Sequence, residues 1–181
     1  MLLPVTKHLA IIRIGMLTLL LSMTSLVAAK DPTEAREENA KTFTVWLIRH
    51  AEKRSDQDDP ELTPAGLARA QRVVTQLAGE PLAKLYSTAY RRTQQTAAPI
   101  STARNLSIQT YDPRHLDEFA AAIKQQQLNA LIVGHSNTTG ELARLLGAKE
   151  VPKIDESTYH WILRLDFSRN QVRLTLGSSD E

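Results

Sequence analysis

The sequence predicts an α/β fold: a three-layer α/β/α sandwich with a mostly parallel central sheet and an antiparallel hairpin at its C-terminal edge. Three short apolar runs, at residues 43–48, 84–86 and 129–133, predict buried strands. Segments with helical spacing lie between these runs, and strands that alternate with helices pair in parallel through right-handed crossovers. Two further strand-like segments, 159–167 and 171–176, are joined by a turn and predict the edge hairpin.

The first predicted helix begins at Thr63, an N-cap residue followed by Pro64 at the first helical position, and it ends before Gly79. Its apolar stripe consists of Leu67, Ala70, Val73, Val74 and Leu77. Residues 92–103 predict a second helix, which we expect Pro99 to kink.

The third predicted helix is marked by an apolar stripe made of Leu116, Phe119, Ala120 and Ile123. Thr138 and Glu141 have the spacing of a capping box and predict the start of a fourth helix, which ends at Gly147.

The chain divides into three segments by composition. Residues 1–29 show the charged, apolar and small-residue order of a secretory signal peptide, which we expect to be cleaved after Ala29; an uncleaved membrane anchor is the alternative. Residues 30–41 are charged and predict a flexible lead-in. Residues 42–181 then form one domain in a periplasmic or secreted protein. The absence of cysteine excludes disulfides and thiolate metal ligands.

The charge of the mature chain gives no support to nucleic-acid binding. The pI near 9.0 belongs to the full sequence. Loss of the leader removes Lys7 and Arg13 but no acidic residue, so the 22 basic residues fall to 20 and equal the 20 acidic ones. Without net charge or a block of lysines, we also expect no stable membrane association after cleavage of the leader.

Charged and polar residues follow the three predicted parallel strands. Arg49 and His50 follow the first strand, Ser87 and Thr88 follow the second and lead to Arg92, and Gly134 and His135 follow the third. Ligands of open α/β sheets bind outside the carboxyl ends of the strands, so these side chains are expected to converge. Two arginines and two histidines beside helix N-termini predict a pocket for a phosphoryl group.

The residue types in this pocket allow phosphoryl transfer. A neutral His50 could attack phosphorus and hold the group as a phosphohistidine until water removes it. Arg49, Arg92 and a protonated His135 would neutralise the equatorial oxygens in the transition state. This chemistry requires no cofactor and no metal ion. Ser87 and Ser136 could donate hydrogen bonds to the phosphate, or each could cap a turn.

Four ordered segments, "LIRHAEK", "LTPAGLARAQ", "YSTAYRRTQQTA" and "LIVGHSNTTGEL", resemble the histidine phosphatase superfamily, the phosphoglycerate-mutase-like proteins. The resemblance extends from about residue 42 to residue 176. It implies that His50 is the phosphorylated nucleophile, that Arg49 and Arg92 are the two arginines of the site, and that His135 is the second histidine. This sequence departs from many members of the family because Ser136, and not an acidic residue, follows that histidine.

The proton donor for the leaving group is therefore open. The candidates are Asp117, Glu118, Glu52, Asp155 and Glu156. Glu52 is preferred because it lies two residues after His50 on the same loop. For Asp117 and Glu118, a purely structural role in the first turn of a helix is the stronger interpretation.

The sequence thus predicts a phosphatase that hydrolyses small phosphomonoesters through a phosphohistidine. A phosphoglycerate-mutase-type transferase and a non-catalytic protein that binds phosphate or a sugar phosphate are the alternatives, followed by a metal-binding protein that uses His50 and His135. The resemblance admits sugar phosphates, phosphorylated envelope glycans and phosphoproteins as substrates, and specificity depends on loops that the fold does not determine.

Overall fold

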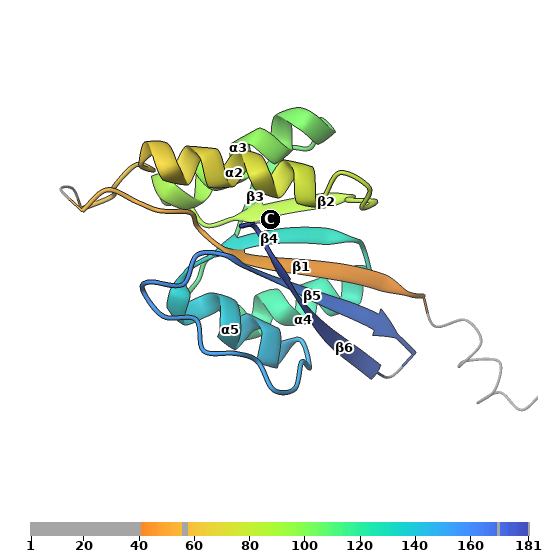
Figure 1. The fold of residues 1–181 in the computed structure, drawn as a ribbon. Coiled ribbons are helices and arrows are strands. Elements are labelled where there is room, and N and C mark those ends of the chain that lie inside the picture. Colours follow the sequence, from red (N-terminus) through yellow and green to blue (C-terminus); the bar gives the residue numbers. More distant parts are fainter. Residues whose placement is uncertain (1–40, 56–57, 170, 181) are drawn as a thin grey trace, which may run out of the picture.

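The computed structural model describes residues 41–55, 58–169 and 171–180 (Figure 1). The expected signal peptide and all but the last residue of the expected lead-in lie outside these residues. The elements, in chain order, are β1 (Phe43–Arg49), α2 (Pro64–Gln76), β2 (Lys84–Ser87), α3 (Arg91–Arg104), β3 (Ile108–Thr110), α4 (Leu116–Gln126), β4 (Ala130–Gly134), α5 (Ser136–Leu145), β5 (Trp161–Ser168) and β6 (Gln171–Ser178).

The six strands form one sheet in the order β3-β2-β4-β1-β5-β6. The four strands from β3 to β1 are parallel, while β5 runs antiparallel to β1 and pairs with β6 as a hairpin at the edge. The predicted α/β fold with a mostly parallel sheet and a C-terminal edge hairpin is confirmed. Strand β1 lies between β4 and β5, which explains why residues 43–48 are almost uniformly apolar.

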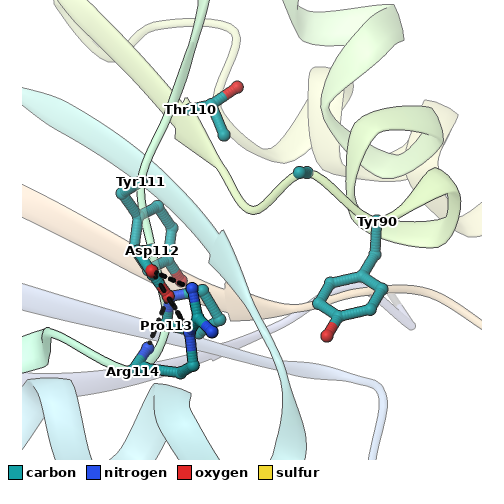
Figure 2. Close-up of a pocket in the computed structure, with 7 residues that line it drawn as sticks. Tyr90, Thr110, Tyr111, Asp112, Pro113 and Arg114 are labelled. Atoms are coloured by element: carbon teal, nitrogen blue, oxygen red, sulfur yellow. Dashed lines mark hydrogen bonds and ion pairs between the residues drawn. The ribbon is translucent and has the colours of Figure 1, made fainter.

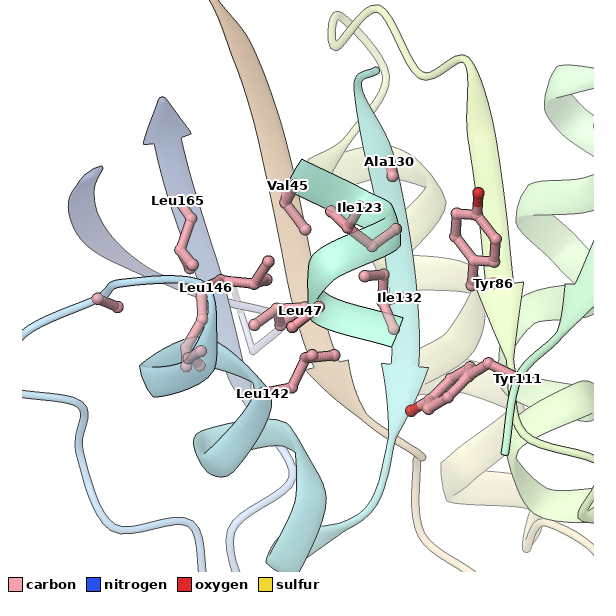
Figure 3. Close-up of a cluster of buried hydrophobic side chains, with 14 of the residues drawn as sticks. Val45, Leu47, Tyr86, Tyr111, Ile123, Ala130, Ile132, Leu142, Leu146 and Leu165 are labelled. Carbon is pink, nitrogen blue, oxygen red and sulfur yellow. The ribbon is translucent and has the colours of Figure 1, made fainter. Parts of the chain in front are cut away.

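Helices cover both faces of the sheet, so the molecule has the three predicted layers (Figure 1). Alternate residues of β1 point to opposite faces. Val45 and Leu47 pack with residues of α4 and α5, in the cluster drawn in Figure 3. Trp46 and Ile48 pack on the other face with residues of α2 and α3. Among the described residues, no helix is both long and apolar enough to cross a membrane.

The predicted start of α2 is confirmed, because the Thr63 hydroxyl accepts a hydrogen bond from the Gly66 amide at 3.1 Å and Pro64 is the first helical residue. The predicted stripe is wrong at Leu67, whose side chain is exposed. The helix ends at Gln76, with Leu77 as its C-cap, shortly before Gly79.

Two local predictions failed near β3 and α5. The capping box of Thr138 and Glu141 is wrong because the N-cap of α5 lies three residues earlier, at His135, whose backbone N–H donates to Oγ1 of Thr138 at 3.0 Å. Strand β3, between α3 and α4, was not predicted, because three residues are too few to show a period of two. Helix α3 contains Pro99 and runs from Arg91 to Arg104.

Candidate active site

The carboxyl ends of three parallel strands bring the expected histidines and arginines to one edge of the sheet. Arg49, the last residue of β1, is in register with Gly134, the last residue of β4. The backbone N–H of His50 donates to the Gly134 carbonyl at 2.9 Å, and this contact places His50 beside His135. The two imidazole rings lie edge to face, with their centroids 5.6 Å apart. The predicted convergence of these two histidines is therefore present.

The buried imidazole of His50 is fixed in one tautomer. Its Nδ1 lies 2.7 Å from the carbonyl oxygen of Ala51, which can only accept a hydrogen bond. Nδ1 therefore carries the proton, and Nε2 has a lone pair. Burial lowers the pKa of His50 to about 3, and the nearby charges of Arg49 and Arg92 lower it as well, although the hydrogen bond to Ala51 acts in the opposite direction. At neutral pH, His50 is an uncharged imidazole with an available nitrogen nucleophile.

The second histidine is fixed in the opposite tautomer. Nδ1 of His135 lies 3.4 Å from Nη2 of Arg92, a group that can only donate, while Nε2 lies 3.0 Å from Oγ1 of Thr88. The Nε2 proton therefore points to Thr88. Burial, followed by the charges of Arg92 and Arg49, lowers the pKa of His135 to about 4. The sequence predicted a protonated His135, but in this arrangement the imidazole is neutral.

Arg92 extends from the first turn of α3 toward His135. Its guanidinium carbon lies 4.4 Å from the centroid of the Tyr90 ring, and Nη1 lies 3.6 Å from a carboxylate oxygen of Asp59. Its Nε is buried and has no hydrogen-bond partner among the described residues. A buried donor without a partner is unfavourable by about 1–3 kcal/mol, so an anion that accepts from this guanidinium would be bound favourably.

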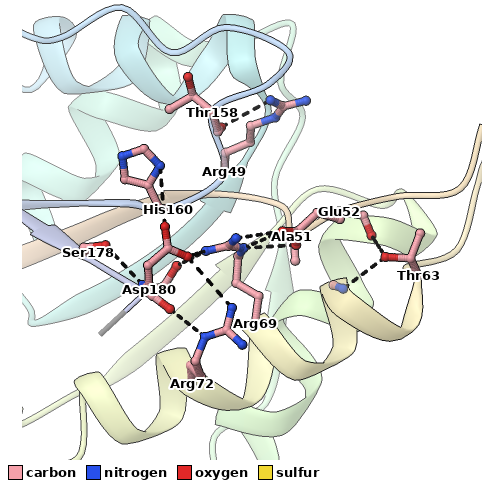
Figure 4. A network of polar contacts seen from close by, with 12 residues as sticks. Arg49, Ala51, Glu52, Thr63, Arg69, Arg72, Thr158, His160, Ser178 and Asp180 are labelled. Carbon is pink, nitrogen blue, oxygen red and sulfur yellow. Dashed lines mark hydrogen bonds and ion pairs between the residues drawn. The ribbon is translucent and has the colours of Figure 1, made fainter.

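Arg49 is buried but points to the segment that precedes β5. Its Nη1 donates to the carbonyls of Asp155 at 2.5 Å and Thr158 at 3.2 Å, and its Nη2 forms an ion pair with Glu156 at 2.8 Å (Figure 4 shows the contact with Thr158). The guanidinium also lies over the ring of Tyr159, at 4.1 Å. Arg49 thus acts on the two histidines through its charge, because its Nη1 and Nη2 donate to protein groups. Its Nε, like that of Arg92, is buried and has no hydrogen-bond partner among the described residues.

A cavity of about 330 Å³ opens over the two histidines. Four of the predicted residues line it: His50, Arg92, His135 and Ser136. Arg49, Glu52 and Ser87 are not part of its lining. The full lining is His50, Lys53, Tyr90, Arg92, Pro113, Arg114, His135, Ser136, Asn137, Thr138 and Glu156.

The geometry does not support Glu52 as the proton donor. Its carboxylate accepts three hydrogen bonds from Arg69 of α2, at 2.7 to 3.0 Å, and Arg69 also binds Asp180 near the C-terminus (Figure 4). Burial raises the pKa of Glu52, but the hydrogen bonds from Arg69, a backbone hydrogen bond and the charges of Arg69 and Arg72 together bring the pKa below its ordinary value. Glu52 is therefore an ionised residue that attaches the nucleophile loop to α2. The sequence preference failed because closeness to His50 along the chain does not determine side-chain direction.

The two serines differ in position. Ser87 is fully buried, and its hydroxyl donates to the carbonyl of Thr88 at 3.0 Å, which supports the turn alternative. Ser136 lines the cavity, and its hydroxyl donates to Glu156.

Glu156 is the one acidic residue in the lining of this cavity among the described residues. Its carboxylate is shared between Ser136 and Arg49. The hydrogen bond from Ser136 and the charge of Arg49 lower the pKa of Glu156, so it is ionised at neutral pH. The other candidates lie elsewhere: Glu118 is exposed and pairs with His115, and Asp155 accepts hydrogen bonds from Ser157 and Thr158. Asp117, in the first turn of α4, is also not part of the cavity lining.

Sequence reasoning missed Tyr90 and Arg114 as residues of the site, and it placed Thr88 at a strand end without giving it a role. Tyr90 lies in the segment "YSTAYRRTQQTA", shortly after β2, so its place after a strand end was an available signal. Arg114 follows β3, the strand that was not predicted. No group of three or more His, Cys, Asp and Glu side chains in the described part of the chain could hold a metal ion. A site built on His50 and His135 would therefore have no third protein ligand of these types among them.

Comparison with known proteins agrees with this arrangement. Residues 45–121 match the family described as the histidine phosphatase superfamily (branch 1), a segment that includes His50 and Arg92 and ends before His135. The sequence has no significant match among curated proteins.

Solved structures share the fold across most of the described chain. The protein histidine phosphatase SixA, complexed with tungstate, is 17% identical with a TM-score of 0.63, and the match covers 76% of this chain and 97% of that one. A mycobacterial glucosyl-3-phosphoglycerate phosphatase is 13% identical with a TM-score of 0.60, over 76% and 98% of the two chains. Phosphoserine phosphatase from Entamoeba histolytica is 17% identical with a TM-score of 0.57, over 75% and 97%. The resemblance to the histidine phosphatase superfamily that the motifs indicate is thus confirmed by the family match over residues 45–121 and, for the fold, by these structures.

Proposed function

We propose that this protein is a phosphatase that hydrolyses small phosphomonoesters through a phosphohistidine on His50. The observation that carries the proposal is the tautomer of His50: the Ala51 carbonyl holds the proton on Nδ1, which leaves the lone pair of Nε2 in a cavity that Arg92 and His135 also line. A neutral imidazole at neutral pH is a competent nucleophile toward phosphorus. Tungstate resembles phosphate in shape and charge, and its presence in the SixA structure supports an oxyanion ligand for a protein of this fold.

The transition state would be stabilised by charge. Arg92, whose Nε has no partner among the described residues, offers its guanidinium to the equatorial oxygens, and a bound dianion would raise the pKa of His135 and favour its protonated form. Arg49 would add its charge from behind the two imidazoles. The bond from Nε2 of His50 to phosphorus forms as the bond to the leaving oxygen breaks, and the leaving oxygen, released as an anion, takes a proton from water. A water molecule then cleaves the phosphorus–nitrogen bond and releases phosphate.

We assign the proton transfer of the second step to Glu156, and we no longer assign Glu52 as proton donor to the leaving group, because its carboxylate is held by Arg69. Glu156 lines the cavity, it is ionised, and Ser136 and Arg49 hold it in place. An ionised carboxylate suits the second step, in which it would accept a proton from the water that attacks the phosphohistidine. This role favours hydrolysis over phosphotransfer, because a mutase must protect the same intermediate from water.

The location and the partners that we propose rest on the amino-acid sequence. We place the mature protein in the periplasm or outside the cell, after cleavage of residues 1–29, with no nucleic-acid partner and no stable membrane association. No metal ion or cofactor takes part in the steps described above.

Turnover of para-nitrophenyl phosphate in the presence of a chelator tests the proposal. We expect phosphate release by the leaderless protein, loss of at least about 100-fold in His50→Gln, and wild-type release in His115→Gln, a control at an exposed histidine outside the cavity. Activity that requires an added metal ion, or that survives in His50→Gln, contradicts the mechanism. Binding of phosphate without turnover would indicate a non-catalytic binding protein.

A further inference from the structure

A second cavity, of about 480 Å³, adjoins the one over the histidines. Tyr90, Pro113 and Arg114 line both cavities, so the two share a wall. Figure 2 shows Tyr90 on one side of the second cavity and residues 111–114 on the other. A phosphomonoester bound at His50 and Arg92 must direct its leaving group out of the first cavity. The volume of the second cavity is within the range of about 300–1,000 Å³ that is typical of small-molecule sites.

Tyr90 is held in position although 43% of it is exposed. The Arg92 guanidinium lies 4.4 Å from the ring centroid, and the ring of His135 is perpendicular to it at 5.1 Å. These contacts reduce the entropy that an exposed aromatic side chain would lose on binding a ligand. Tyr90 is therefore a preformed apolar surface directly beside the phosphoryl site.

The opposite wall is polar and electrically neutral. Arg114 donates to the Asp112 carboxylate from Nε and Nη2, at 2.7 to 3.2 Å, and its backbone N–H donates to the same carboxylate at 3.0 Å. The two opposite charges compensate each other, so the pair does not favour a second anionic group on the substrate. The carboxylate lone pairs and the guanidinium N–H groups still suit uncharged hydroxyl groups.

From these walls we propose that the second cavity is a subsite for the leaving group and that it binds an uncharged, hydroxylated ring, the chemistry of a monosaccharide, flat against Tyr90 with its hydroxyl groups toward Asp112 and Arg114. A sugar ring presents apolar C–H groups on its faces and hydroxyls at its edge, which matches an aromatic wall opposite a polar one. This subsite rests on the proposed function, because it receives the part of the phosphomonoester that leaves.

A matched pair of substrates measures how much the sugar ring contributes to kcat/KM. Glucose 6-phosphate and sorbitol 6-phosphate carry the same phosphoryl group and similar hydroxyls, but only the first contains a ring. We expect kcat/KM to be roughly tenfold higher for glucose 6-phosphate. Tyr90→Phe keeps this ratio, whereas Tyr90→Leu brings it close to one. Substitution of Tyr90 could also displace Arg92 or His135, but this would change kcat/KM for both substrates by the same factor. The ratio of the two kcat/KM values therefore reports only on the leaving group. Equal kcat/KM values in the wild type, or an unchanged ratio in Tyr90→Leu, would overturn the subsite.

A charged substrate tests the opposite wall. 6-Phosphogluconate, which is open-chain like sorbitol 6-phosphate but carries a carboxylate, should be a poorer substrate than sorbitol 6-phosphate. Asp112→Asn leaves the charge of Arg114 uncompensated and should raise relative kcat/KM for 6-phosphogluconate several-fold. An unchanged preference in this variant contradicts the role of the neutral pair.

Calorimetric titration gives the subsite a readout that does not depend on turnover. Tighter binding of glucose 6-phosphate than of sorbitol 6-phosphate, in a protein that releases no phosphate from any substrate, would support the subsite and contradict the proposed function. Phosphate release with no preference in binding or in kcat/KM would support the function and overturn the subsite.

Discussion

Oγ1 of Thr88 lies 3.0 Å from Nε2 of His135, in a fully buried contact. The Thr88 hydroxyl lies 2.8 Å from that of Thr93, which in turn donates to the Tyr90 carbonyl at 2.8 Å. Because this carbonyl can only accept, the direction of donation along the chain is fixed. Nε2–H of His135 donates to the Thr88 hydroxyl, and that hydroxyl donates to Thr93. The chain of hydroxyls holds His135 in the tautomer that turns Nδ1 toward Arg92.

Thr88→Val should disrupt this arrangement without a large change in volume. The buried Nε2–H of His135 would lose its acceptor, which lowers the free energy of unfolding by about 1–3 kcal/mol. We also expect kcat for para-nitrophenyl phosphate to fall about tenfold, because His135 can then rotate or change tautomer. Thr88→Ser keeps the hydroxyl and serves as the control. A valine variant with wild-type kcat would show that the contact does not position His135 for turnover.

Stability should depend on pH through the two buried histidines. Their pKa values are lowered to about 3 for His50 and about 4 for His135, whereas histidine in the unfolded chain has its ordinary pKa near 6.5. Below pH 6.5 the unfolded chain therefore binds more protons, so the free energy of unfolding decreases as the pH falls, by up to ~1.4 kcal/mol per pH unit for each histidine.

Denaturant unfolding between pH 5.5 and 7 measures this dependence, in a range above the ordinary pKa of carboxylates. His50→Asn should reduce the slope, while His115→Asn, at an exposed position, should keep it. An unchanged slope in His50→Asn would mean that His50 is not buried in its neutral form.

Helix α2 packs closely on the nucleophile loop at Gly66. A Cβ atom at this position would lie 2.3 Å from the backbone oxygen of Glu52, so Gly66→Ala must displace either the helix or the loop. We expect a loss of about 1–3 kcal/mol in the free energy of unfolding, together with a lower kcat. Gly79→Ala is the matched control, because nothing lies within 4 Å of the added atom. Similar stabilities of the two variants would contradict the close packing.

Substitution of Glu52 should mainly change stability, and substitution of Glu156 should mainly change turnover. Glu52→Gln weakens the contact with Arg69 and should lower Tm while most of kcat is retained. Glu156→Gln removes the proposed proton acceptor and should reduce kcat about 100-fold or more, with little change in Tm, because the side chain is largely exposed. Measurement of Tm and kcat for both variants tests the assignment. The reverse pattern would restore Glu52 as the residue that transfers the proton.

The sequence predicted the fold well where apolar periodicity was strong. Strand β1 and helix α2 were found with nearly correct ends, because a buried central strand is uniformly apolar and because Thr63 and Pro64 are specific start signals. Strand β3 was missed because three residues carry too little pattern. The start of α5 was misplaced because His135 is an unusual N-cap, and the side-chain oxygen of Thr138 only stabilises the turn that His135 begins.

The site could be predicted in part. Strand order brings His50 and His135 together, and the α/β topology alone implies that their strand ends meet. Side-chain direction could not be predicted. Arg49 turns to the carbonyls of residues 155 and 158, and Glu52 turns to Arg69; both contacts join residues far apart in the chain. For the same reason, Glu156 was one of five acidic candidates and could not be singled out.

Trapping of a phosphoenzyme tests the central claim most directly. The wild-type protein would be mixed with a ³²P-labelled phosphomonoester, quenched within milliseconds in base and in acid, and digested to locate the label. We expect a phosphoryl group that is stable in base, is lost in acid, maps to the peptide containing His50 and is absent in His50→Gln. An acid-stable label, a label on another residue, or turnover in His50→Gln would contradict the phosphohistidine mechanism.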